Sequence, residues 1–332
     1  MGFEIKENRK RIVSVGSALV DMLAREEDAF LDIEGAAKGG MTLIESHQID
    51  RIVARTTLTP AIVPGGSACN TAIGIGMLGG VARFVGKRGE DPIGELFEAD
   101  LVRNNVEPKL LRSEAPTGRV LSIITPDAQR TMFTYLGAAS EMRPDEISPE
   151  WFEDAAIVHV EGYLLFNREL MAAVLAAAKA AGARISLDLA SFTVVEGAKD
   201  ILDRIVAEDI DILIANEDEA LAFTGHRDES KALEALSRDV DIAVLKIGAR
   251  GSIIAGNGEI VAIKAVGDGS AVDTTGAGDL WAAGFLYGLV NGYSFEQSGA
   301  IGSTCGYEVC QLIGAKISDN GWQRIRELVV LP

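Results

Sequence analysis

The sequence predicts an α/β fold in which helices cover both faces of a central, mostly parallel β-sheet, with a small second β-sheet beside it. Three observations predict this fold. From Trp151 onward, strand-like and helix-like segments alternate regularly, as they do around parallel sheets. Glycine-rich turns lead from strands into helices. Several short strands before Leu136 have no place in this alternation, so we assign them to the second sheet.

Length and composition agree with such a fold and exclude some classes of function. The chain has 332 residues, 48% of them hydrophobic and 24% charged. Its formal net charge of −18 argues against binding to nucleic acid or to an anionic membrane. Its three cysteines lack zinc-type pairing and its three histidines are scattered. We therefore expect neither a metal cluster nor a disulfide framework, and we expect a cytoplasmic protein.

The first element is a buried strand over Ile12–Val20 that breaks at Gly16 and Ser17. This apolar run is too short to cross a membrane, and a charged tail before a first strand explains it better than a signal peptide does. Asp21 comes just past its carboxyl end. Because ligands gather at that end of parallel strands, Asp21 is a candidate for holding substrate hydroxyls. A turn or helix-capping acid explains it equally well locally.

Insertions at about 41–47, 60–64 and 117–136 are expected to build the second sheet. The last of them reads as a hairpin around the turn Pro126–Arg130. We expect one domain over residues 1–332, with this sheet as a lid that excludes water from a site. A homodimer through the same sheet is the structural alternative, and the two roles are compatible.

The turn Pro64-Gly-Gly-Ser-Ala-Cys-Asn70 leads into a helix beginning at Thr71. Its adjacent glycines leave main-chain N–H groups accessible, and Asn70 is placed to reach a ligand. Glycines inside that helix match a dinucleotide-binding fingerprint, but they do not connect a strand to a helix, so we reject that interpretation. A strand over Val81–Val85 precedes a loop over 86–94, which lacks the residues of a Walker A motif, and a helix to about Asn104.

The second half of the chain places further polar groups at strand ends. Asn216-x-x-Glu219 begins a helix directly after a strand, and an amide and a carboxylate so placed can orient water around Mg²⁺. A capping box is the purely structural alternative. Lys246, with Gly248 and Gly251, is placed to flank a triphosphate, although a β-turn with a solvated lysine has the same pattern. The expected strands and helices are 157–160, 169–181, 185–189, 199–207, 210–215, 217–223, 242–247 and a meander over 252–266.

Asp273-Thr-Thr-Gly-Ala-Gly-Asp279 is the most informative stretch, because it is a loop that feeds an apolar helix. The N–H groups of a first helical turn have no partner inside the helix, and the helix dipole favours an anion there. Gly276 and Gly278 let a phosphate approach without meeting a Cβ. Asp279 is then either a first-turn helix acid or a base for an attacking hydroxyl.

The two motifs at 65–70 and 273–279 resemble those of the ribokinase family, also called PfkB carbohydrate kinases. The resemblance covers nearly the whole chain and implies a ribokinase-like fold and an ATP-dependent phosphotransferase. By this resemblance Asp279 is the base, and Gly276, Ala277 and Gly278 form an anion hole for the γ-phosphate. The resemblance implies that ATP is bound by Asn216, Lys246, Gly248, Gly251 and Thr275. It implies that Asn216 and Glu219 hold Mg²⁺ through water, and that Asp273 with Thr275 contacts a monovalent cation such as K⁺.

Further segments, among them Leu19-Val-Asp21 and Glu161-Gly-Tyr163, look most like the adenosine kinase branch of that family. The implied reaction is transfer of a phosphoryl group from ATP to the 5′-hydroxyl of a ribonucleoside. The implied ribose ligands are Asp21, Gly65, Gly66 and Asn70. The alternative is a kinase for a ribose- or fructose-type sugar. Leu280-Trp281 and Asp188-Leu-Ala-Ser191 depart from the pattern of the branch.

Overall fold

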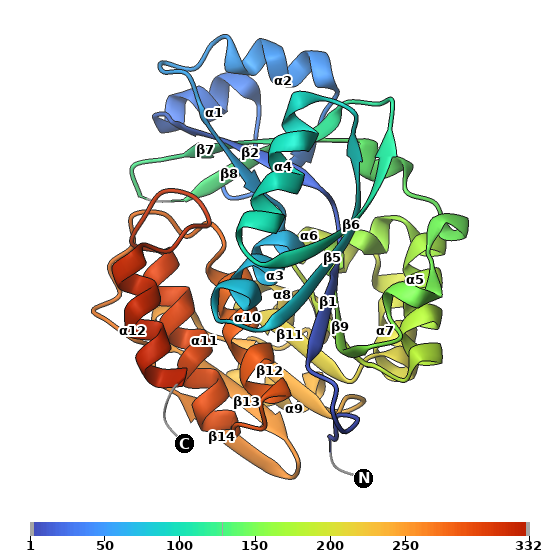
Figure 1. Cartoon of the computed structure of the whole chain (residues 1–332). Coiled ribbons are helices and arrows are strands. Elements are labelled where there is room, and N and C mark those ends of the chain that lie inside the picture. Colours follow the sequence, from blue (N-terminus) through green and yellow to red (C-terminus); the bar gives the residue numbers. More distant parts are fainter. Residues whose placement is uncertain (1–2, 128, 330–332) are drawn as a thin grey trace.

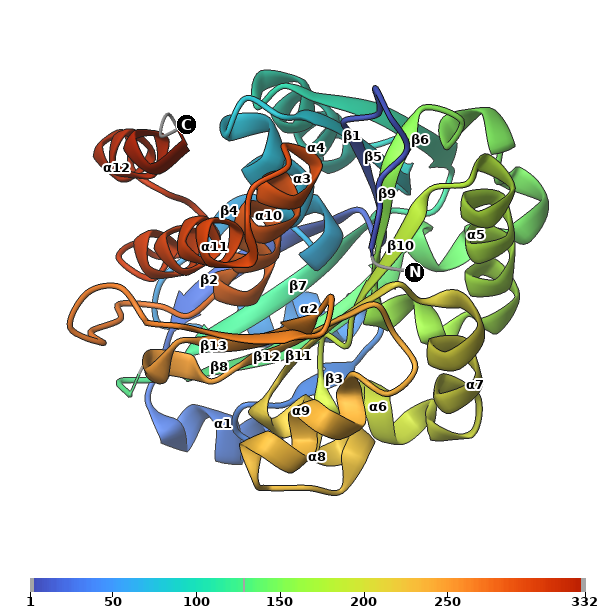
Figure 2. The same cartoon turned by 90° about the horizontal axis from the view of Figure 1, so that it is seen from below.

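The computed structural model describes residues 3–127 and 129–329. A large nine-stranded sheet runs through the molecule, and a five-stranded sheet lies over the carboxyl ends of its strands (Figures 1 and 2). Both sheets and their helices confirm the predicted fold class. Within the described ranges, no helix combines the length and the apolar character needed to cross a membrane.

The large sheet is mostly parallel, as predicted. Its strand order is β14-β13-β12-β11-β10-β9-β1-β5-β6, and only the pairs β12–β13 and β13–β14 are antiparallel. Its central strands are buried on both faces, which explains why their sequences are continuously apolar. The strands are β1 (Arg11–Val15), β5 (Val81–Gly89), β6 (Val106–Ser113), β9 (Ala155–Glu161), β10 (Arg184–Asp188), β11 (Ile212–Asn216), β12 (Ile242–Lys246), β13 (Ser252–Gly256) and β14 (Glu259–Ile263).

Helices pack on both faces of this sheet and divide the core into two layers. One layer contains apolar side chains of α5, α7, α8 and α9, and the other contains those of α3, α4, α10 and α11. The helices are α3 (Ser67–Met77), α4 (Pro92–Arg103), α5 (Arg168–Ala181), α6 (Phe192–Gly197), α7 (Lys199–Asp209), α8 (Glu217–Thr224), α9 (Glu229–Leu236), α10 (Ala277–Val290), α11 (Phe295–Val309) and α12 (Asp319–Val329). Short 3-10 helices span Ala138–Glu141, Pro144–Glu146, Pro149–Trp151, Gly162–Phe166 and Gly248–Arg250.

The second sheet has the strand order β3-β8-β7-β2-β4. Two helices, α1 (Asp28–Glu34) and α2 (Ser46–Val53), cover its outer face with their own small apolar core. The predicted hairpin is confirmed as β7 and β8. The strands are β2 (Leu19–Arg25), β3 (Met41–Leu43), β4 (Ala61–Gly65), β7 (Thr117–Ile124) and β8 (Arg130–Gly137).

The predicted position of Asp21 just past a strand end is wrong. The chain leaves the large sheet after Val15 and continues as β2, which pairs with β4 and β7 of the second sheet. Asp21 is therefore the third residue of β2. Both β1 and the first half of β2 are buried, and an apolar pattern does not show that a chain changes from one sheet to another.

The prediction of a loop over 86–94 is also largely wrong, because β5 continues to Gly89. Residues 82–89 of β5 pair with the whole of β6. Lys87 and Arg88 lie in the part of this segment that is a strand. Both are buried, and they form ion pairs with Glu146 and Glu98. Ion pairing allows charged residues to occupy a buried strand.

Candidate active site

A cavity of about 640 Å³ lies between the carboxyl ends of the large sheet and the inner face of the second sheet. The large sheet contributes the final residues of four neighbouring strands, and α10 contributes its first turn. The second sheet closes the other side with residues of β2, β3, β7 and β8, so it covers the site as a lid. The charged and polar lining residues include Asp21, Ser67, Asn70, Arg130, Glu161, Asp188, Asn216, Glu219, Lys246 and Asp279.

Asp279 lies in the first turn of α10 with both carboxylate oxygens engaged. Ser67 Oγ donates to Oδ1 at 2.7 Å, and Asn70 Nδ2 donates to Oδ2 at 2.8 Å. Burial raises the pKa of Asp279, and these two hydrogen bonds oppose that rise. The predicted sites at 65–70 and 273–279, more than two hundred residues apart, thus meet at this carboxylate.

The backbone before Asp279 has the geometry predicted for an anion site. Gly276 precedes α10 with a φ of 77°, a left-handed conformation that disfavours a side chain. Gly276, Ala277 and Gly278 all line the cavity. A Cβ added to Gly278 would lie 3.0 Å from Lys246 Nζ, so an ammonium group stands beside the first turn of α10, whose N–H groups before Leu280 have no partner inside the helix.

Lys246 is held in this position by Asp188, the last residue of β10. Its Nζ lies 2.8 Å from Asp188 Oδ2, and both side chains are almost fully buried. Burial disfavours the charged lysine, but the carboxylates of Asp188 and Glu219 outweigh this effect and raise its pKa. Asp188 Oδ1 accepts the N–H of Ala190 at 3.0 Å, and Ala190 is itself in the left-handed region at φ 63°.

Asn216 and Glu219 form the capping box that was the structural alternative. Asn216 Oδ1 accepts the Glu219 N–H at 2.9 Å, and the two Glu219 oxygens accept from the Asn216 main chain and amide, each at 2.7 Å. Burial raises the pKa of Glu219, and Lys246 opposes that rise. Both side chains nevertheless line the cavity, so capping does not remove them from it.

The side-chain oxygens of Asn216 and Glu219 are the predicted ligands for the waters of Mg²⁺. Among the described residues, no group of three or more His, Cys, Asp or Glu side chains is arranged to hold a metal. The hard oxygens of Asn216 and Glu219 at the cavity wall fit an ion that keeps its waters and binds mainly to substrate phosphates.

On the acceptor side, Asp21 lies 5% exposed at the cavity wall. Burial is the main reason why its pKa is raised to about 6, and Arg130 opposes the rise. Gly65 makes room for it, since a Cβ there would lie 2.2 Å from Asp21 Oδ2. Gly66, with a φ of 94°, lines the cavity beside Asn70.

Five of the predicted site residues lie outside the cavity lining as far as the described residues define it: Gly65, Gly248, Gly251, Asp273 and Thr275. Gly248 and Gly251 form the turn after β12, both with positive φ. Asp273 Oδ1 accepts two hydrogen bonds from Thr275, and Oδ2 accepts the N–H of Gly314 at 2.8 Å. The assignments of these residues to ATP and to a monovalent cation stay predictions.

Several polar lining residues were not predicted as site residues, among them Ser67, Arg130, Glu161 and Asp188. Glu161 directly follows the predicted strand 157–160, and Asp188 is the next-to-last residue of the predicted strand 185–189, so the rule that ligands gather at carboxyl ends of parallel strands could have found them. Arg130 had no such signal, because only the fold of the hairpin brings it over the site.

Leu280 and Trp281, the departures beside Asp279, pack into the core. Leu280 is 2% exposed in a cluster with Leu78 and Ile301. The Trp281 ring stacks on Phe285 with centroids 5.0 Å apart. Neither is among the described residues that line the cavity.

Known proteins are similar to this chain in sequence and in structure. Residues 45–320 match the pfkB family of carbohydrate kinases. The structure of adenosine kinase from Sinorhizobium meliloti is 32% identical, with a TM-score of 0.91 over 96% of this chain and 99% of that one. A probable sugar kinase from Rhizobium etli CFN 42 is 30% identical, with a TM-score of 0.92 over 97% and 99%.

A ribokinase from Arabidopsis thaliana is 30% identical over 86% of this chain and 72% of its own length. The family match covers most of the chain. The chain therefore belongs to the pfkB family of carbohydrate kinases, and it is a phosphotransferase that acts on an alcohol group of a sugar or nucleoside.

Proposed function

We propose that this enzyme transfers the γ-phosphate of ATP to the 5′-hydroxyl of a ribonucleoside, with an adenosine-like molecule as the first candidate. One observation carries the choice of acceptor. Beside the polar groups that suit a ribose, the cavity has an extended apolar wall that a free sugar does not need and a nucleobase does. Its residues are Met41, Leu43, Val120, Met132, Leu136, Tyr163, Leu164 and Phe166.

In this proposal Asp21 and Asn70 hold the ribose hydroxyls, and Asp279 accepts the proton of the attacking 5′-hydroxyl. The burial that raises the pKa of Asp279 makes it a stronger base than an exposed aspartate. The first turn of α10 and Lys246 then stabilise charge on the transferring phosphoryl group. Positioning and charge neutralisation supply most of the catalysis in such transfers.

Magnesium and a monovalent cation belong to the same proposal. Mg²⁺ bound to the ATP phosphates would neutralise their charge, and Asn216 and Glu219 would hold its water ligands. Asp273, with Thr275, would contact K⁺ at the start of the anion-hole loop. The three hydrogen bonds to Asp273 give that carboxylate a fixed orientation.

A sugar kinase is the second candidate, favoured by the 30% identity to the Arabidopsis ribokinase. The test is an ADP-release assay with adenosine, guanosine, cytidine, ribose and fructose. We expect kcat/KM for adenosine to exceed that for either sugar by at least about a hundredfold, because burial of the apolar base contributes binding free energy that a sugar lacks. Faster turnover of ribose or fructose than of every nucleoside contradicts the proposal.

A substitution in the apolar wall gives a second test. Met132→Ser should raise KM for the nucleoside by about tenfold, since it removes apolar contact with the base. It should leave KM for any sugar that is turned over unchanged. Leu58→Ser is the matched control, because Leu58 is 78% exposed and is not among the described residues that line the cavity. An equal effect of Met132→Ser on sugars and nucleosides contradicts a base-binding wall.

A further inference from the structure

Glu161 is a buried carboxylate in the cavity to which the proposed reaction gives no role. It ends β9 and is 1% exposed. Its Oε1 accepts the main-chain N–H of Ser17 at 2.8 Å, and its Oε2 accepts that of Ala68 at 3.0 Å. Gly16 allows this approach, since a Cβ there would lie 2.3 Å from Glu161 Oε2.

The two donors belong to two different parts of the site. Ser17 lies between β1 of the large sheet and β2 of the lid, where the chain passes from one sheet to the other. Ala68 is in the first turn of α3. It lies between Ser67 and Asn70, the residues that hold the two oxygens of Asp279. One carboxylate therefore joins the junction of the lid to the support of the base.

The charge of Glu161 suits this position better than an amide would. Burial raises its pKa, while the hydrogen bonds from Ala68 and Ser17 oppose the rise. Within the described residues Glu161 has no ion-pair partner, so the N–H groups and the N-terminal end of α3 are what favour the charged form. A carboxylate offers acceptors to both N–H groups, whereas a glutamine offers one acceptor and places an NH₂ group against the other donor.

We infer that Glu161 is a positioning residue that fixes the lid junction and the start of α3 as one unit, so that the position of the lid and the orientation of the Asp279 carboxylate are coupled. This inference rests on the proposed role of Asp279 as the base. It does not depend on whether the acceptor is a nucleoside or a sugar.

The first test is Glu161→Gln, assayed with whichever acceptor the wild-type enzyme turns over fastest. The variant loses a charged hydrogen bond, and its NH₂ group faces a main-chain N–H group. We therefore expect kcat to fall by about 10- to 100-fold. KM for ATP and for the acceptor should stay within about threefold. Glu146→Gln is the matched control. Glu146 also binds a buried partner, Lys87, but is not among the described lining residues, so its kcat should equal that of the wild type.

Two further measurements separate positioning from a general loss of stability. In a double-mutant cycle, Glu161→Gln and Ser67→Ala should be non-additive in kcat, because both act through the orientation of Asp279. Hydrogen exchange should be faster in Glu161→Gln over residues 16–19 and 66–72, and unchanged over α5. This readout requires no turnover.

Three results overturn the inference. The first is an unchanged kcat in Glu161→Gln. The second is an effect confined to KM for the acceptor, which indicates direct contact with the substrate, and the third is additivity with Ser67→Ala. If Glu161→Gln does not fold, Glu161→Asp replaces it, since its shorter carboxylate reaches only one of the two N–H groups. An unchanged kcat there overturns the inference equally. Failure of the proposed function appears elsewhere, as full activity in Asp279→Asn or as a sugar preference in the wild type.

Discussion

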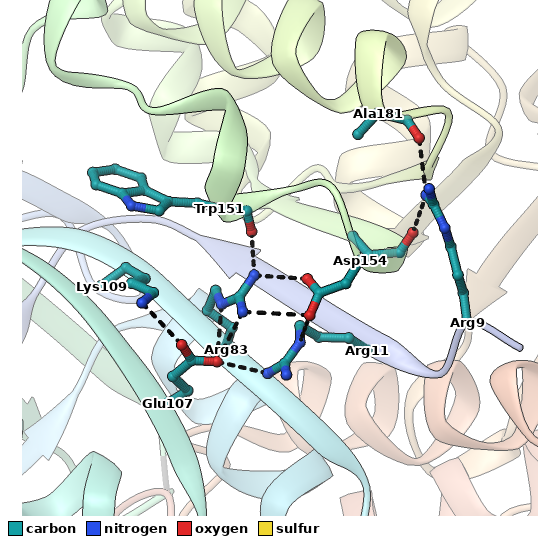
Figure 3. A network of polar contacts seen from close by, with 9 residues as sticks. Arg9, Arg11, Arg83, Glu107, Lys109, Trp151, Asp154 and Ala181 are labelled. Atoms are coloured by element: carbon teal, nitrogen blue, oxygen red, sulfur yellow. Dashed lines mark hydrogen bonds and ion pairs between the residues drawn. The ribbon is translucent and has the colours of Figure 1, made fainter.

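Two clusters of charged residues lie at opposite ends of the large sheet, and only in one of them do the cations at least match the carboxylates in number. Near the amino ends of β1 and β5, Arg83 donates to Glu107, to Asp154 and to the Trp151 carbonyl (Figure 3). Arg11 binds the same two acids, and Lys109 pairs with Glu107. Burial alone would raise the pKa of both acids, but these cations outweigh it and lower the pKa.

At the carboxyl ends of the strands the balance is reversed. The described lining of the cavity contains more carboxylates than cations: Asp21, Glu161, Glu169, Asp188, Glu219 and Asp279 against Arg130, Arg168 and Lys246. Burial raises the pKa of Asp21, Glu161, Glu219 and Asp279. Perturbed acids of this kind cluster at functional sites. The first cluster thus contributes to the stability of the fold. The acids of the second cluster destabilise the folded state when they are ionised, which is typical of groups that act on a ligand.

Asp279→Asn should give the largest effect. If the cavity acids are kept for chemistry, this variant loses its proton acceptor, and kcat should fall by about 10³-fold, while ATP binding measured by calorimetry persists. Asp154→Asn is the matched control in the balanced cluster and should leave kcat unchanged. Full turnover in Asp279→Asn would remove the assigned role of this carboxylate.

Arg83→Met should reduce the free energy of unfolding by about 2 kcal/mol, because it removes the buried guanidinium that Glu107 and Asp154 share, while Arg11 still pairs with both acids. Its kcat should be that of the wild type. Both acids have a lowered folded-state pKa, so their contribution is complete above the ordinary pKa values and is lost as pH falls. The stability difference measured in urea should therefore shrink below about pH 4. A constant difference would show that packing, not charge, is responsible.

Asp21→Asn should instead stabilise the fold at neutral pH, by on the order of 2 kcal/mol, while raising KM for the acceptor. The pKa of Asp21 is raised from 3.8 to about 6, so ionisation of this residue destabilises the native state. That cost develops as pH rises from about 4 to 6 and is constant above. Thermal unfolding should show a gain for the variant at pH 8 and none at pH 4. A lower melting temperature at pH 8 contradicts this account.

Lys246→Met and Lys87→Met form the finest comparison, since both lysines are buried and paired with a carboxylate. Only Lys246 stands beside the anion hole. Lys246→Met should weaken ATP binding by about tenfold, roughly 1.4 kcal/mol, as measured by calorimetry. Lys87→Met should lower stability and leave ATP affinity unchanged. Equal ATP affinity in the two variants would mean that Lys246 has only a structural role.

The sequence by itself determined the strands β9–β12 with the helices α5, α7 and α8, the meander of β13 and β14, and the helix that follows the 273–279 motif. These features depend on local patterns: buried parallel strands are continuously apolar, and Gly276 directly precedes the helix that contains Gly278. The same local rules predicted both explanations of Asn216 and Glu219, and the structure shows the capping box with both side chains in the cavity.

Only the tertiary structure decided where the chain changes sheets and which charges meet. Asp21 reaches the site from a lid strand, Arg130 from a hairpin, and Lys246 is held by an acid 58 residues away in the sequence. Lys87 and Arg88 look like loop residues until Glu146 and Glu98 neutralise them. Local sequence records hydrophobicity and turn preference, whereas the energy of a buried charge depends on partners that only folding brings near.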